Sequence, residues 1–256
     1  MSADRMLKAR LAGRELVVGT FVKTPSLTVV EVLARTMLDC VCLDAEHAPF
    51  DRGSLDSCIL AARAGGMEVL VRVPSAAPEH LLNALDCGAT GVVVPHVRTI
   101  SEAEGVVKAA HYGHGGRGYA GSSRAAGYTT LTMARHKANS AEQTVVIAQI
   151  EDPEAVEQVE AIAAVPGLDA LFVGRVDLTV AYGAETQDDP RVLAAVDRVC
   201  AAGVAAGKPV GMFLARVDDV ADWRERGASL FLLGSDHGFL LAGANELVRR
   251  VKGQAG

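Results

Sequence analysis

The feature that most constrains this chain is a regular alternation of short apolar runs with helical patterns along its whole length. Each run is rich in Val, Ile and Leu and lacks polar alternation, as expected for a parallel strand that is covered on both faces. Neighbouring parallel strands need a crossover connection, and the helical pattern after each run provides one. The sequence therefore predicts an α/β protein with a parallel sheet.

The number of repeats favours one of the two common parallel-sheet folds. The expected strands span residues 16–22, 38–43, 69–71, 91–94, 145–150, 168–174, 209–213 and 229–233. About eight β/α units in roughly 250 residues match the size and repeat number of a TIM (β/α)8 barrel. An open, doubly wound sheet is the alternative, but no G-x-G-x-x-G follows the first expected strand.

No linker rich in Pro, Ser or charge interrupts this repeat, so residues 1–256 are expected to form a single domain. The composition shifts only once, between Gly113 and Gly127. We interpret residues 112–140 as an active-site loop insertion, because they come after the fourth strand and hold arginines among glycines. Arg117 and Arg124 are the candidates to touch a substrate or a neighbouring subunit.

Composition excludes several classes of partner. The net charge of −6 and the absence of a basic stripe argue against nucleic acid. No apolar run is long enough to span a membrane, the amino terminus is not a signal peptide, and the cysteines form no disulfide or zinc pattern, so a cytoplasmic protein is expected. The five cysteines are Cys40, Cys42, Cys58, Cys87 and Cys200.

The polar residues that follow the expected strands are the candidate site. In a TIM barrel, functional groups come from the carboxyl ends of the strands. The groups at those ends are Asp44, Glu46, His47, Arg72, Gln149, Glu151 and Asp177. They are expected to converge on one mouth.

Glu151 and Asp177 follow two successive strands and are expected to lie within reach of one cation. Two carboxylates with an oxygen-rich substrate suit Mg²⁺ or Mn²⁺, with Co²⁺ as a further option. Gln149 shares a strand face with Glu151 and should lie one layer below it. Either carboxylate alone fits a cap or a solvated strand end better than a metal site, so the metal site depends on the pair and its neighbours.

Arg72 and His47 add the other groups that the chemistry needs. Arg72 offers a planar donor fork that suits a carboxylate or a developing enolate oxygen. His47 brings an imidazole, the side chain most used as a general base, and Asp44 is placed to hold its tautomer. A metal, a cation and a base together fit proton abstraction next to a carbonyl, although Arg72 as a plain salt bridge and His47 as a turn residue remain alternatives.

Several of these motifs together resemble one known family. LDAEHAPFD (43–51), VRVP (71–74), Arg117-Gly118, AQIED (148–152) and VGRVDLT (173–179) are similar to the motifs of the metal-dependent pyruvate aldolases of the HpcH/HpaI family. The resemblance spans nearly the whole chain, in order. It implies a carbon–carbon lyase that adds the enolate of pyruvate or hydroxypyruvate to an aldehyde and reverses the reaction.

The resemblance also implies residue roles. The matching residues would be Glu151 and Asp177 for the metal, Arg72 for the enolate oxygen, and His47 with Asp44 behind it for protons carried by a metal-bound water. Gly174 and the amides through Val176 to Asp177 would seat the pyruvate carboxylate, next to Gln149. This chain has Arg175-Val176 where the family usually has Pro-Ala, which bears on the choice of acceptor.

Other functions stay open at this point. A CoA-thioester lyase of malyl or citramalyl type belongs to the same superfamily. Gly234-Ser235-Asp236 resembles the phosphate-binding turns of phosphosugar isomerases and epimerases. A barrel that binds pyruvate or oxalate without turnover is a third reading.

The last expected helix, residues 239–251, is apolar around much of its circumference. A helix that covers a barrel needs only one apolar stripe, so its other side is expected to meet another subunit. The family resemblance adds a homohexamer in which this helix is swapped between barrels.

Overall fold

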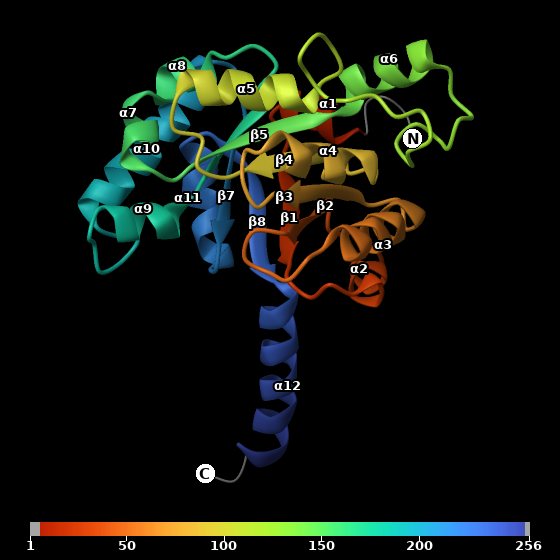
Figure 1. The fold of residues 1–256 in the computed structure, drawn as a ribbon. Coiled ribbons are helices and arrows are strands. Elements are labelled where there is room, and N and C mark those ends of the chain that lie inside the picture. The colour runs from red at the N-terminus through yellow and green to blue at the C-terminus, as the bar shows by residue number, and fades with distance from the viewer. Residues whose placement is uncertain (1–5, 254–256) are drawn as a thin grey trace.

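The computed structural model describes residues 6–253, which form a closed barrel of eight parallel strands (Figure 1). The strands are β1 (Val17–Val22), β2 (Cys40–Asp44), β3 (Glu68–Arg72), β4 (Gly91–Val94), β5 (Val145–Ile150), β6 (Ala170–Val173), β7 (Val210–Leu214) and β8 (Ala228–Ser235). They follow one another around the barrel in chain order, and β8 closes it against β1. The predicted TIM (β/α)8 barrel is confirmed.

The helices connect the strands, precede the first one or follow the last, and most of them cover the outside of the barrel (Figure 1). They are α1 (Leu7–Ala12), α2 (Leu27–Leu33), α3 (Arg52–Ala64), α4 (Pro78–Asp86), α5 (Ile100–Ala110), α6 (Met133–Gln143), α7 (Pro153–Glu157), α8 (Val159–Ala163), α9 (Arg175–Ala181), α10 (Pro190–Ala205), the 3-10 turn η2 (Val217–Asp219), α11 (Val220–Glu225) and α12 (Asp236–Lys252). The larger part of the core lies between strands and helices.

A second, smaller core fills the inside of the barrel. Phe21, Cys42 and Phe172 belong to it, because alternate residues of a strand face inward. Leu7 and Leu11 of α1 join the same cluster and close the amino-terminal end of the barrel. All five cysteines are free and buried, as expected for small hydrophobic residues.

Two local predictions were wrong. The single helix expected over residues 153–166 is two short helices, α7 and α8, broken at the non-helical Gln158. The break lets both pieces bury apolar residues against the barrel. Helix α9 was not expected at all, because its seven residues follow Gly174, which has no side chain to cap a helix. It carries Asp177 in its first turn.

The insertion at residues 112–140 lies at the opposite end of the barrel from the expected one. It follows α5, which returns the chain to the amino-terminal ends of the strands, and not β4 itself. In Figure 1 this yellow-green segment lies beside α1, whereas α12 leaves the other end. The insertion thus lies away from the mouth of its own barrel, and its role as an active-site loop, with Arg117 or Arg124 touching a substrate or a neighbouring subunit, stays a prediction.

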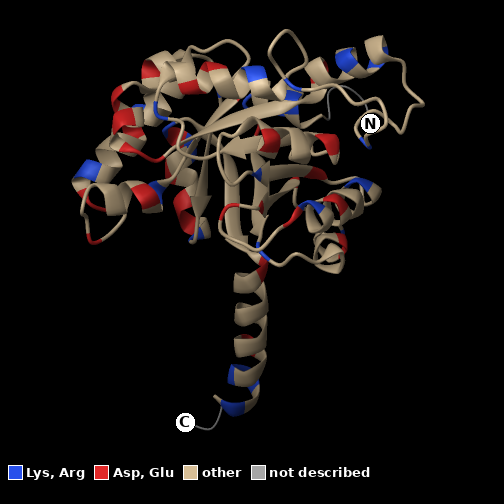
Figure 2. Cartoon of the chain, in the orientation of Figure 1, with Lys and Arg blue, Asp and Glu red and all other residues tan. Residues whose placement is uncertain are grey.

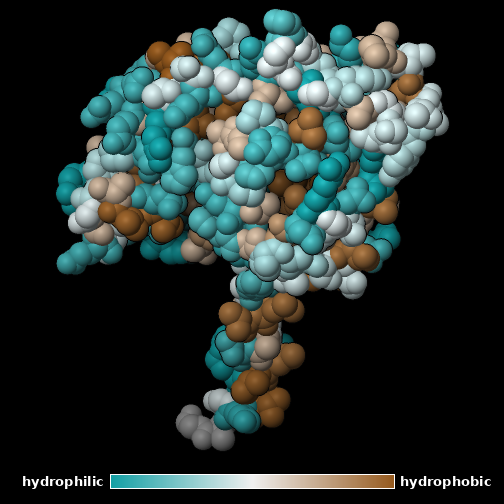
Figure 3. Space-filling model, viewed as in Figure 1, coloured by the Kyte–Doolittle hydropathy of each residue, from teal (hydrophilic) through white to brown (hydrophobic). Residues whose placement is uncertain are grey.

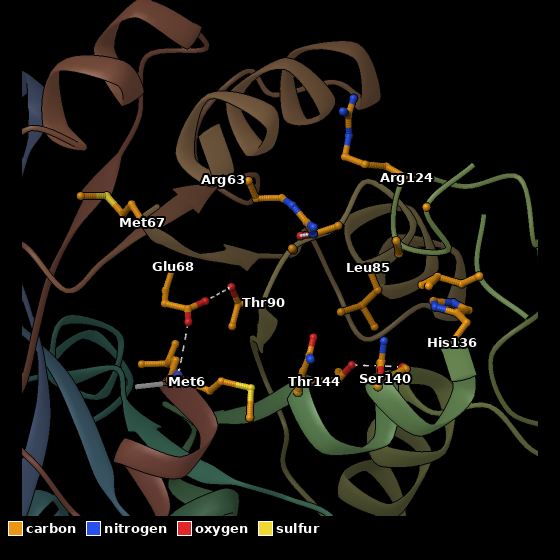
Figure 4. Close-up of a pocket in the computed structure, with 18 of the residues that line it drawn as sticks. Met6, Arg63, Met67, Glu68, Leu85, Thr90, Arg124, His136, Ser140 and Thr144 are labelled. Carbon is orange, nitrogen blue, oxygen red and sulfur yellow. Dashed lines mark hydrogen bonds between the residues drawn. The ribbon is translucent and has the colours of Figure 1, made fainter. Parts of the chain in front are cut away.

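The insertion instead encloses a pocket of about 590 Å³ (Figure 4). Glu68, Thr90 and Thr144 line it, and each stands at the start of a strand or just before one. The dashed lines in Figure 4 include the hydrogen bond from Thr90 Oγ1 to Glu68 Oε2, of 2.6 Å. This pocket is thus built from the amino-terminal face.

Helix α12 projects away from the barrel and does not cover it (Figure 1). Among its described residues only Asp236 is buried, and Val251 is 82% exposed. Figure 3 shows its apolar side chains gathered along one side, and Figure 2 shows its basic residues near the far end. The expectation of a stripe packed on its own barrel was wrong, whereas contact with another subunit remains a prediction.

Within the described residues, none of the helices has the length and apolar character that a membrane crossing requires.

Candidate functional site

Asp44 and Arg72 form the centre of the mouth at the carboxyl ends of the strands. They are partners in the register between β2 and β3, so their side chains emerge next to each other. Arg72 donates from Nε to Asp44 Oδ1 over 3.0 Å and from Nη2 to Oδ2 over 2.8 Å. The ring of Phe21 lies 4.6 Å from the guanidinium carbon. This two-point bond and the stacked ring fix the plane of the guanidinium.

Asp44 is fully buried, and its partners stabilise the charged form of its carboxylate. Burial acts to raise the pKa of Asp44, but the hydrogen bonds and charge of Arg72 outweigh it and lower the pKa. The carboxylate also accepts the backbone N–H of His47 over 3.1 Å and lies 3.1 Å from Lys23 Nζ.

The imidazole of His47 does not have the partner that was predicted for it. Asp44 bonds only the backbone of His47, while the exposed ring has Nε2 3.7 Å from Glu46 Oε2. The prediction that Asp44 holds the tautomer of His47 is therefore wrong, because Arg72 and Lys23 already occupy the Asp44 oxygens. His47 nevertheless lies at the predicted mouth.

Glu151 is held at the end of β5 by three neighbouring groups. Gln149 donates a short hydrogen bond from Nε2 to Glu151 Oε2, so the two residues share a strand face as predicted. Oε1 of Glu151 accepts the backbone N–H of His96 over 2.8 Å. A Cβ at Gly174 would lie 2.6 Å from Oε2 of Glu151, so only glycine fits beside this carboxylate.

A group of metal-capable atoms lies around Glu151. One donor atom each from Glu46, His96 and Glu151 lie within 4.8 Å of one another. Oε2 of Glu46 is buried without a hydrogen-bond partner among the described residues. Burial raises the pKa of both Glu46 and Glu151, and the negative charge of Asp177 raises both further. Crowded and poorly solvated carboxylates of this kind are suited to holding a cation.

His96 is not among the strand-end residues selected from the sequence, yet it belongs to this group. Its backbone has a φ of 53°, which a histidine adopts only at some cost, and its Nδ1 lies 3.0 Å from Asp152 Oδ2. Burial acts to lower the pKa of His96, but the hydrogen bond to Asp152 and the charge of Glu151 raise it overall. His96 follows β4 and Pro95 directly, so the rule that functional groups lie at the carboxyl ends of the strands could have identified it.

After β6, Asp177 lies on the side of the mouth, whereas Arg175 lies away from it. Asp177 is half-buried and close enough to affect Glu46 and Glu151, whereas Val176 is half-exposed. Arg175 is buried, stacks on Trp223 at 4.8 Å and lines a separate pocket of about 530 Å³ between α9 and η2. Arg175 therefore supports the packing of the α9 loop.

The turn at Gly234-Ser235-Asp236 has its donors and acceptors already in use. Asp236 is buried and accepts the backbone N–H groups of Lys23 over 2.8 Å and Thr24 over 2.9 Å. Ser235 Oγ accepts the N–H of Gly238. A buried carboxylate at this turn repels a phosphate, which disfavours the phosphosugar reading.

These features define a barrel enzyme with an acidic, metal-capable site and a fixed arginine at its carboxyl-terminal mouth. The sequence matches the profile of the HpcH/HpaI aldolase/citrate lyase family over residues 18–242. The chain belongs to this family, and it is a lyase of the aldolase class.

Individual relatives agree with this placement. The chain is 32% identical to hydroxypyruvate/pyruvate aldolase of Paraburkholderia phytofirmans, over 96% of this chain and 97% of the relative. It is 33% identical to 5-keto-4-deoxy-D-glucarate aldolase of Salmonella arizonae, over 96% of both chains. A crystal structure of a family member from Burkholderia cenocepacia has a TM-score of 0.90 and 35% identity, and covers 96% of this chain and 98% of that one.

Proposed function

We propose that this protein cleaves a 4-hydroxy-2-oxo acid reversibly into pyruvate, or hydroxypyruvate, and an aldehyde, with a divalent metal ion as cofactor. The observation that carries the proposal is the crowding of Glu46, His96 and Glu151 beside a fixed arginine. Such a site combines a divalent metal ion, which carboxylate oxygens bind, with the guanidinium of Arg72, which attracts an anionic substrate. The relatives that act on pyruvate, hydroxypyruvate and a keto sugar acid support the substrate class.

The residues present fit a hard divalent ion. The donors nearby are carboxylates and one imidazole, and Oε2 of Glu46 accepts no hydrogen bond among the described residues. We propose Glu151 and Asp177 as the ligands, with Glu46 and His96 next to them, and Mg²⁺ or Mn²⁺ as the ion. When bound, the metal supplies Lewis-acid polarisation of the 2-oxo group.

Each side chain at the mouth has a proposed role of its own. Arg72, held flat by Asp44, binds the oxygen on which the enolate charge develops. His47 is exposed and next to Glu46, so it takes the proton of the 4-hydroxyl group during cleavage, and that proton returns to carbon 3 of the enolate. Gly174, Gln149 and the backbone at Val176 seat the substrate carboxylate beside Glu151.

The first prediction is that activity depends on the metal. Pyruvate-dependent consumption of a short hydroxyaldehyde should stop in EDTA and return on addition of Mn²⁺ or Mg²⁺, because neither Arg72 nor His47 alone polarises the 2-oxo group enough. The products should be followed by proton NMR. Full activity in the chelator, or a pyruvate adduct trapped on a lysine by borohydride, would contradict the proposal.

The second prediction concerns assembly. We propose that the exposed apolar side of α12 packs against another subunit in a homohexamer, because its leucines and valines are otherwise left in water. Light scattering should give several times 26.7 kDa. The double change Leu240→Glu and Leu247→Glu should lower that mass, whereas Asn245→Glu on the same helix should not. A monodisperse, active monomer of the unaltered chain would refute this assembly.

A further inference from the structure

Lys23 is a residue of the mouth that none of the roles above uses. It follows β1 directly, and its Nζ lies 3.1 Å from Asp44 Oδ2. The same oxygen accepts Arg72 Nη2 over 2.8 Å. Asp44 is fully buried, so it joins the two cations through one carboxylate that water does not reach. The side chain of Lys23 is 32% exposed, on the side of the mouth.

Lys23 balances the negative charge around Arg72. Arg72 lies within ion-pair distance of Asp44 and also of Glu46, with 3.3 Å from Nε to Glu46 Oε2. One arginine against two carboxylates leaves a net negative charge where an anionic substrate must bind. Adding Lys23 makes this group of four side chains neutral. Coulomb interactions at these distances are strong in a partly buried site, so the second cation matters.

The backbone of Lys23 is fixed as firmly as its side chain. Asp236, the first residue of α12, accepts the N–H groups of Lys23 and Thr24 on its two carboxylate oxygens. Asp236 is buried; burial acts to raise its pKa, but these hydrogen bonds lower it, so the carboxylate is ionised. A lysine on a freely moving loop would need no such anchor.

We propose that Lys23 is a positioning residue that acts through Asp44: it balances the carboxylates around Arg72, so that the positive charge of Arg72 is left to attract the 2-oxo acid and its enolate. The inference rests on the proposed function. Among the described residues, Nη1 of Arg72 donates no hydrogen bond, so this nitrogen remains available to donate to a substrate. Lys23 thereby affects the first half of the reaction, before any aldehyde takes part.

The experiment separates the two halves of the reaction. Exchange of the methyl protons of pyruvate with D₂O, in the presence of Mn²⁺ and without aldehyde, reports enolate formation, and calorimetry with oxalate reports binding of an enolate-like anion. Lys23→Met should slow the exchange and weaken oxalate on the order of 10- to 100-fold, the scale for partners behind a site residue. Lys23→Arg should restore most of both. Mn²⁺ affinity should stay unchanged.

Lys208→Met is the matched control. Lys208 precedes β7 at the other end of the barrel, where its Nζ donates to Val165 O over 2.6 Å. It should leave exchange and oxalate binding unchanged. If Lys23→Met does not fold, Lys23→Gln replaces it, and the melting temperature of each variant is recorded to separate loss of folding from loss of charge.

The outcomes distinguish this inference from the proposed function. No exchange and no oxalate binding by the unaltered enzyme would refute the function itself. Normal exchange in Lys23→Met would overturn the inference and leave the function intact. An effect that appears only with certain aldehydes would also overturn it, because Lys23 would then contact the acceptor. Equal slowing with every aldehyde, together with rescue by arginine, is the expected result.

Discussion

The two ends of the barrel use charged side chains in different ways. At the amino-terminal end, beside the insertion, two arginines each have one carboxylate: Arg117 is paired with Asp86, although its Nε has no hydrogen-bond partner among the described residues, and Arg124 bonds the partly exposed Asp56 over 2.6 Å. At the mouth, by contrast, Asp44, Glu46 and Glu151 are shared among few cations, and Oε2 of Glu46 has no hydrogen-bond partner among the described residues. Charged side chains that are paired with each other stabilise the fold. Charged side chains that lack a full set of partners are typical of a site that binds a ligand.

The pocket at the amino-terminal end lies away from the proposed site. The pocket of about 590 Å³ in Figure 4 lies at the amino-terminal face, beside α6 and the insertion. Its walls include Arg63, whose Nη1 donates to the Gly88 carbonyl over 3.0 Å, and Glu68, which bonds Thr90. These polar groups are satisfied by the fold. The chemistry of the donors is therefore a better guide than volume.

The largest effect is expected from Glu151→Gln and Asp177→Asn at the mouth. Each should abolish turnover and Mn²⁺ binding measured by calorimetry, because a neutral amide is a poor ligand for a hard cation. Glu151→Gln should leave the metal-free protein at least as stable, because burial raises the pKa of Glu151: its charged form costs stability in the folded state, and a neutral amide removes that cost.

Glu160→Gln is the control, since Glu160 lies on α8 in an exposed pair with Arg198. It should change neither metal binding nor turnover. If both mouth variants bind Mn²⁺ with unchanged stoichiometry, the mouth is not the metal site, and it no longer differs in this respect from the amino-terminal end.

The next largest effect is expected from Arg72. Arg72→Ala should lower kcat/KM by about 10²- to 10³-fold, or roughly 2–4 kcal/mol, the scale for deleting an oxyanion donor. Arg72→Lys keeps the charge but loses the planar, two-point bond to Asp44, so we expect it to recover only part of the loss. Steady-state kinetics on folded protein, checked by circular dichroism, gives the answer. Full activity in Arg72→Lys would mean that only charge matters at this position.

The barrel and part of its mouth follow from local rules. Strand period and strand-end position suffice to predict that Gln149 lies below Glu151, and that Asp44 and Arg72 come from neighbouring strands. The motif resemblance named the pyruvate aldolase class, which the family match confirms. The metal ligands Glu151 and Asp177 and the role of His47 stay predictions.

The remaining features depend on contacts that local patterns do not encode. The roles of His96 and Lys23 come from the pairing of β4 with β5 and of β1 with β2 and β8, which brings distant residues together. The insertion lies at the amino-terminal end because α5 runs back from the mouth before the insertion begins. The apolar side of α12 was visible in the sequence, but a helical pattern does not say what covers it.

The smallest effect on catalysis is expected at the amino-terminal end. Asp86→Asn removes the charge partner of Arg117, whose side chain is only 2% exposed. The free energy of unfolding should fall by about 3 kcal/mol, because a buried guanidinium loses its counter-charge. Turnover per folded subunit should change less than two-fold, since this face lies opposite the mouth. Urea unfolding and kinetics on the same preparation test both parts. A large loss of kcat/KM without loss of stability would show that the insertion serves an active site, by way of a neighbouring subunit, and would end the contrast between a structural and a catalytic end.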